Sequence, residues 1–183
     1  MILIIDMTDP NLRLSKWEFV DPIAQIVTNI VSVTVCHYEK YEESMLEKYD
    51  GVILSGTALK DYRYLDNPKD FEWISKSEKP LLGICAGMQI IGITYGCRLR
   101  DNKYIGLTKV RTSLENKLFN GEFEAYNLRG KDLELSDEVI ELAKSDDCIQ
   151  AIKHKSKPHY GVLFHPEVRN AEIVKNFIKL IND

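Results

Sequence analysis

The sequence predicts an α/β fold: one unit with a central, mainly parallel sheet and some antiparallel strands in its second half. Short apolar segments alternate with helical segments in the first half of the chain, which is the pattern of βαβ units. From about residue 106, strand-like segments follow one another without helices between them. A length of 183 residues is typical of one domain, so we expect residues 1–183 to form a single domain.

Each element rests on a local pattern in the sequence. Short apolar runs, typical of strands buried on both faces, predict strands at residues 1–6, 52–54 and 81–84. Valine-rich or alternating segments predict the other strands, at residues 31–38, 107–112, 123–128, 149–154 and 160–164, with a turn at 155–159. Apolar residues at helical spacing predict helices at residues 22–27, 42–49, 71–77, after Cys85 to near Gly96, and at 171–181.

Composition and charge exclude several classes of function. Lys and Arg total 24 against 28 Asp and Glu, a formal charge of −4, which argues against nucleic-acid binding as the main activity. No apolar stretch approaches the ~20 residues of a membrane span. The four cysteines are scattered and form no Cys-x-x-Cys pair, so we expect free thiols in a reducing, cytoplasmic setting.

The segment around Cys85 carries the first chemical signal. Gly83-Ile84-Cys85-Ala86-Gly87 lies between a predicted strand and a predicted helix, which is the pattern of a nucleophile elbow with a thiol. The two glycines would let the strand and the helix approach closely. Cys85 would sit in a strained conformation at a helix N-terminus, where the helix dipole favours thiolate. The alternative is a buried cysteine that packs as a small apolar residue.

A cysteine nucleophile needs a base, and His165 is the candidate. His165 ends an apolar strand-like run, and Glu167 follows two positions later, on the same side of an extended backbone. A carboxylate placed there can orient the imidazole and stabilise imidazolium. A histidine and a glutamate at this spacing often lie at the end of a strand without a catalytic role, with the glutamate in solvent. Together with the elbow, they favour a Cys85-His165-Glu167 triad.

An oxyanion hole is the third requirement of acyl chemistry. Ser55-Gly56-Thr57 directly follows a buried strand, so it is expected at the carboxyl edge of the sheet, where the active sites of α/β proteins gather. The backbone N–H groups of Gly56 and Ala86 are the natural pair of donors. For Gly56, an ordinary turn is the alternative.

Three motifs together resemble those of the class I (triad-type) glutamine amidotransferases: L-S-G-T at residues 54–57, G-I-C-A-G-M-Q at 83–89 and F-H-P-E-V at 164–168. The resemblance spans nearly the whole chain and implies a three-layer α/β/α fold of the flavodoxin-like kind. It implies that Cys85 is the nucleophile, His165 the acid/base and Glu167 its orienting partner. It also implies that Gly56 and Ala86 bind the oxyanion and that Gln89 helps to hold the substrate glutamine.

The activity that the resemblance implies is hydrolysis of the glutamine side-chain amide through a glutamyl thioester. The ammonia would pass to a separate ATP-dependent synthetase, because the amidotransferase unit uses all of this chain. ATP and Mg²⁺ are therefore expected only on that partner, with no cofactor or metal in this chain. Chain length and residues 149–168 resemble the amidotransferase subunit of archaeal-type GMP synthases more than other members.

Three positions depart from the commonest family pattern. Thr57 stands where a second glycine is common, Met88 stands where a histidine is common, and Asn127-Leu128 is a poor match to a common serine–histidine pair. Two other functions therefore stay open. One is a stand-alone γ-glutamyl hydrolase or peptidase that uses the same triad. The other is a non-catalytic regulatory module with the same fold.

Overall fold

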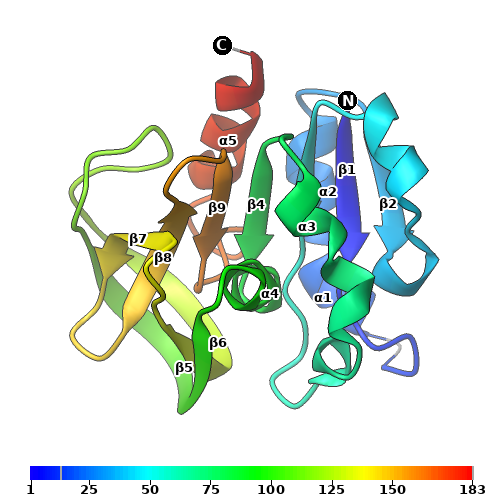
Figure 1. Ribbon diagram of the computed structural model, residues 1–183. Coiled ribbons are helices and arrows are strands. Elements are labelled where there is room, and N and C mark those ends of the chain that lie inside the picture. The colour runs from blue at the N-terminus through cyan, green and yellow to red at the C-terminus, as the bar shows by residue number, and fades with distance from the viewer. Residues whose placement is uncertain (13, 183) are drawn as a thin grey trace.

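A computed structural model describes residues 1–12 and 14–182 of the chain, and within them the strands form one mixed sheet. The strand order is β2-β1-β3-β4-β9-β8-β7-β5-β6. Figure 1 shows helices on both faces of the parallel part of this sheet, which is the three-layer α/β/α arrangement that the family resemblance implies. Within the described residues, no helix combines the length and apolar character needed to cross a membrane.

The parallel half of the sheet holds the predicted buried strands. Its members, in spatial order, are β2 (Val33–His37), β1 (Ile2–Asp6), β3 (Gly51–Leu54), β4 (Leu81–Ile84) and β9 (His159–Val162). Neighbouring strands pair in parallel, so all five carboxyl ends meet at one edge. Successive side chains of β1 point to opposite faces of the sheet. Ile2 and Ile4 therefore pack in the core on one face, and Leu3 and Ile5 in the core on the other.

Helices cover the two faces of the parallel half. Apolar residues of α2 (Asp21–Thr28) and α5 (Glu172–Asn182) belong to the core that contains Ile2 and Ile4. Those of α3 (Trp73–Lys76) and α4 (Ala86–Thr94) belong to the opposite core. The segment predicted as a helix at 42–49 is a 3₁₀ segment, Glu43–Lys48, and the short helix α1 (Ser15–Phe19) was not predicted.

The antiparallel half is larger than predicted. It contains β8 (Ile149–His154), β7 (Val139–Lys144), β5 (Arg98–Thr112) and β6 (Glu122–Glu134), joined by antiparallel pairing. The prediction missed residues 98–106 because they are mostly exposed and polar, and so lack an apolar pattern. It missed β7 because Glu141, Leu142 and Lys144 favour helix, and pairing with β8 overrides that preference.

Candidate active site

Cys85 occupies the sharp turn between β4 and α4. Its backbone has φ 49° and ψ −100°, a conformation that L-residues rarely adopt, as the elbow motif predicts. A Cβ added to Gly83 would lie 2.3 Å from the backbone carbon of Gly87, and one on Gly87 would lie 2.5 Å from the carbonyl oxygen of Leu54. Both glycines are therefore required for the close approach of strand and helix, which confirms the interpretation of the motif.

His165 and Glu167 lie just beyond β9, at the same edge of the sheet. Nδ1 of His165 and Oε1 of Glu167 are 2.7 Å apart, and both side chains are only 1% exposed. The backbone N–H of His165 donates to the carbonyl of Tyr126 at 2.8 Å, and the ring of Phe19 packs 5.4 Å from the imidazole. The imidazole is thus fixed in orientation by its carboxylate, by the backbone and by packing.

The structure brings the thiol, the imidazole and Gly56 together. The carbonyl oxygen of Leu128 lies 3.6 Å from Sγ of Cys85 and 3.4 Å from Nε2 of His165, so both groups meet at one atom. A Cβ added to Gly56 would lie 2.7 Å from Cε1 of His165 and 3.6 Å from Cβ of Cys85. The segments that carry Gly56, Cys85 and His165 are far apart in sequence, and the structure places these residues within a few ångströms of one another, as the motifs predict.

The surroundings of His165 favour imidazolium. Complete burial alone would lower its pKa, but the negative charge of Glu167 and interaction with Cys85 outweigh burial and raise the pKa well above the usual value of 6.5. The hydrogen-bond geometry agrees, because each ring nitrogen faces an oxygen acceptor: Glu167 at Nδ1 and the Leu128 carbonyl at Nε2. Only the doubly protonated ring can donate to both.

The segment after β3 is held by its own side chains. The hydroxyl of Ser55 accepts from the N–H of Met7 at 3.0 Å and donates to the carbonyl of Gly56 at 2.9 Å. The hydroxyl of Thr57 donates to Asp61, which also accepts from the N–H of Asp9 at 2.7 Å. Thr57 thus ties this loop to its neighbours in place of the glycine that the commonest pattern has.

The amide of Gln89 makes two hydrogen bonds within the protein. Its Oε1 accepts from the hydroxyl of Tyr64, and its Nε2 donates to the carbonyl of Lys131 at 3.1 Å. The side chain is buried, and it links α4 to β6. Its role toward a substrate stays a prediction. Met88, which stands where the commonest family pattern has a histidine, packs against Gly161 of β9 and belongs to the core.

Sequence reasoning missed the part that β6 plays at the site. Backbone carbonyls of Tyr126, Leu128 and Lys131 contact the N–H of His165, the reactive pair and Gln89, respectively. Cys85 is only 5% exposed as a result, so the thiol is not at the surface as a prominent elbow would suggest. A main-chain carbonyl has no signature in the sequence. The only hint was the departure from the family pattern at Asn127-Leu128.

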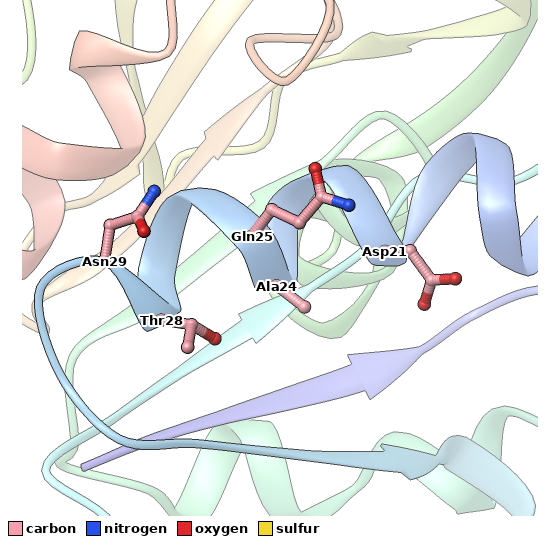
Figure 2. Close-up of a pocket in the computed structure, with 5 residues that line it drawn as sticks. All are labelled: Asp21, Ala24, Gln25, Thr28 and Asn29. Atoms are coloured by element: carbon pink, nitrogen blue, oxygen red, sulfur yellow. The ribbon is translucent and has the colours of Figure 1, made fainter.

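Other features of the surface lie apart from this site. Figure 2 shows a depression along α2 that is lined by Asp21, Ala24, Gln25, Thr28 and Asn29, none of which belongs to the Cys85 site. Among the residues that the structure describes, no three His, Cys, Asp or Glu side chains are grouped so that they could hold a metal ion.

Comparisons with known proteins show which family the chain is similar to. The model of the family "Glutamine amidotransferase class-I" matches residues 21–181. The chain is 40% identical over 141 residues to a glutamine-hydrolysing GMP synthase subunit of Methanocaldococcus jannaschii, covering 71% of this chain and 73% of that protein. It is 36% identical over 174 residues to the subunit of the same name in Methanococcus maripaludis strain C5, covering 88% and 86%.

Solved structures show the same fold. A protein of Thermoplasma acidophilum, provisionally assigned as the corresponding GMP synthase subunit, superposes with a TM-score of 0.88 at 25% identity, covering 99% of this chain and 93% of that one. A glutamine amidotransferase of Thermotoga maritima superposes with a TM-score of 0.71 at 22% identity, covering 100% and 83%.

The chain therefore belongs to the class I glutamine amidotransferases. Its activity is that of a glutamine amidotransferase.

Proposed function

We propose that this protein is the glutamine-hydrolysing subunit of a two-chain GMP synthase, and that it supplies ammonia to a separate ATP-dependent synthetase. Its relatives in two methanogens carry the name of such a subunit, and the match covers most of their length. The site adds chemical support, since a cysteine at an elbow and a histidine held by a glutamate suit acyl transfer. We also propose a cytoplasmic location, which the free cysteines favour.

The first step is attack by the Cys85 thiolate on the side-chain carbonyl carbon of glutamine. As the carbon–sulfur bond forms, the carbonyl electron pair moves to oxygen, and the oxyanion accepts hydrogen bonds from the N–H groups of Gly56 and Ala86. Ala86 begins α4, so the positive end of the helix dipole faces the same charge. Gln89 helps to hold the substrate.

His165 completes the two half-reactions. Its imidazolium donates the Nε2 proton to the amide nitrogen, the carbon–nitrogen bond breaks, and ammonia leaves a glutamyl thioester on Cys85. The neutral imidazole then takes a proton from water, which attacks the thioester and breaks the carbon–sulfur bond. Glutamine and water thus become glutamate and ammonia, and Cys85 returns as thiolate. Glu167 stays ionised and orients the ring.

One observation carries the proposal: the 2.7 Å contact between His165 and Glu167 lies beside a cysteine held at positive φ. The test measures glutamate release by the wild type, Cys85→Ala and His165→Asn, alone and with the separate synthetase, ATP and the nucleotide that it aminates. We expect weak hydrolysis by the wild type alone, a strong increase with the complete system, and loss in both variants.

Two results would contradict the proposal. Full activity of Cys85→Ala would exclude the thiol as the nucleophile. Rapid hydrolysis of γ-glutamyl peptides without any synthetase would favour a stand-alone hydrolase instead.

A further inference from the structure

Tyr64 carries a buried hydroxyl group beside the candidate site that the proposed mechanism does not use. It lies in the 3₁₀ segment Arg63–Leu65, and it is only 2% exposed. Burial and the negative charge of Cys85 raise the pKa of Tyr64 far above its ordinary value, so the hydroxyl stays protonated and can donate a hydrogen bond. Its acceptor is Oε1 of Gln89.

The amide of Gln89 lies within one helical turn of the nucleophile. The backbone N–H of Gln89 donates to the carbonyl of Cys85 at 3.0 Å, in the first turn of α4. Side chains of a helix lean toward its N-terminus, so this amide extends back toward the turn that holds Cys85. The direction of the amide therefore decides which polar atoms it presents beside the thiol.

The two neighbours of Gln89 fix the direction of its amide. The carbonyl of Lys131 can only accept, so it must face Nε2, which donates to it at 3.1 Å. Tyr64 then faces Oε1 and donates to it. A primary amide has two N–H groups and two lone pairs on oxygen, and within the described part of the chain these two bonds use one of each. One N–H and one lone pair remain, in a fixed direction, to bind polar groups of the substrate.

Asp61 places Tyr64 beside this amide. One carboxylate oxygen of Asp61 accepts from the N–H of Arg63 at 3.2 Å, directly before Tyr64 in the chain, and the other accepts from the hydroxyl of Thr57. Thr57 follows Gly56, the expected oxyanion donor, and stands where the commonest family pattern has a second glycine. This departure thus has a physical consequence, because it connects the oxyanion segment to Tyr64.

We propose that Tyr64 is a positioning residue for glutamine binding that acts through Gln89: its hydroxyl holds the amide in the one direction that suits the substrate. This inference rests on the proposed function, in which Gln89 contacts the substrate, and adds the residue that orients it. Without the Tyr64 hydroxyl, the buried Oε1 of Gln89 loses its donor, and the amide turns to find another. Glutamine then binds more weakly, whereas the chemistry at Cys85 is unchanged.

A double-mutant cycle tests the proposal, with hydrolysis of glutamine measured in the complete system that contains the synthetase. Tyr64→Phe removes one hydroxyl and should raise KM for glutamine about fivefold, with kcat within about twofold of the wild type. Gln89→Met keeps the shape of the side chain and should raise KM by at least as much. Because Tyr64 acts through Gln89, adding Tyr64→Phe to Gln89→Met should raise KM no further.

Tyr41→Phe is the matched control. Tyr41 packs against the same core layer as Tyr64, and its buried hydroxyl has no hydrogen-bond partner among the described residues, so its removal should leave KM and kcat unchanged. A second measurement does not depend on turnover. Calorimetry should show that Tyr64→Phe weakens glutamine binding to Cys85→Ala by the same factor, which decides the proposal even if Gln89→Met does not fold.

Contrary results are equally defined. An unchanged KM in Tyr64→Phe removes the positioning role. Effects of Tyr64→Phe and Gln89→Met that multiply would show that Tyr64 does not act through Gln89, as expected of a residue that only supports the core. A fall in kcat at constant KM would place Tyr64 in the chemical steps instead. The proposed function fails separately, if Cys85→Ala still hydrolyses glutamine.

Discussion

At the scale of single residues, Cys85 shows a conflict between stability and chemistry. A side chain at φ 49° and ψ −100° costs roughly 1–3 kcal/mol, and glycine would avoid that cost. The surrounding contacts enforce the conformation, because the N–H of Cys85 donates to Val162 at 2.8 Å and its carbonyl accepts from Gln89 at 3.0 Å. The position is thus occupied by a strained cysteine, as expected when the thiol itself is needed.

This conflict predicts that two substitutions at Cys85 differ in their effect on the free energy of unfolding. Cys85→Gly should raise the free energy of unfolding by about 1 kcal/mol relative to Cys85→Ala, because glycine adopts this backbone conformation readily. Both variants should lose glutamine hydrolysis. Urea unfolding of the two purified variants measures the difference. A glycine variant less stable than the alanine variant would show that the turn is not strained.

At the scale of elements, the elbow depends on contact between backbones. Gly83 in β4 faces Gly87 in α4 so closely that a methyl group would meet main-chain atoms at 2.3–2.5 Å. Main chain cannot move aside as a flexible side chain can. The strand, the turn and the helix are therefore one unit, and α4 is placed by β4 as much as by its own apolar residues.

Gly83→Ala should therefore destabilise the protein by about 3 kcal/mol or more, since overpacking against backbone displaces the whole helix. Gly121→Ala is the control: a methyl group there meets nothing within 4 Å, so only its φ of 73° opposes the change. We expect a cost of about 1 kcal/mol for the control. Chemical denaturation of both variants provides the comparison, and equal losses would contradict close packing at Gly83.

Sequence patterns predicted the strands that are covered on both faces and missed part of the antiparallel half. Residues 2–6, 51–54 and 81–84 are strands covered on both faces, so their apolar character alone identifies them. Residues 98–106 form strand through pairing with β6, without an apolar face to mark them. The same distinction applies to the site. Side chains at strand ends could be predicted, whereas the Leu128 carbonyl depends on how the hairpin curls.

At the scale of the whole molecule, histidines in different places respond to pH in opposite directions. Burial, aided by the charge of Lys157, lowers the pKa of His159 to about 4, and burial also lowers that of His154. His165 has a raised pKa, because Glu167 and Cys85 outweigh its burial. In the unfolded chain, all three titrate near 6.5.

The thiolate of Cys85 would cancel the extra proton of His165 in the wild type, so the test uses Cys85→Ala, whose free energy of unfolding should have a maximum near pH 6.5. Below it, the unfolded state binds more protons through His154 and His159, so stability rises with pH. Above it, the folded state holds an extra proton on His165, so that contribution is lost as pH rises through the raised pKa, by up to about 1.4 kcal/mol per pH unit.

Urea unfolding between pH 5 and 8.5 measures this profile. Glu167→Gln in the same Cys85→Ala background is the matched variant, because it removes the carboxylate that keeps His165 protonated. We expect the decline above pH 6.5 to flatten in this variant while the rise below pH 6.5 remains. An unchanged decline in Glu167→Gln would show that Glu167 does not sustain the charge of His165.

The site as a whole combines the ends of β3, β4 and β9 with one strand of the antiparallel half. Figure 1 shows why this is possible: the β5–β6 hairpin reaches the edge of the sheet where β4 and β9 end and α4 begins. The parallel half supplies Gly56, Cys85 and His165, and the antiparallel half supplies the strand that covers them.

Acid quenching of the wild type during turnover of radiolabelled glutamine, with the synthetase present, tests the proposed chemistry most directly. We predict a base-labile glutamyl thioester on Cys85, located by fragmentation within residues 77–98, the tryptic peptide that Cys85 shares with Cys97, and none on Cys36, Cys97 or Cys148. Glutamate formed at full rate without any label on Cys85, or with label on another cysteine, would contradict the assignment of Cys85, His165 and Glu167 as one catalytic unit.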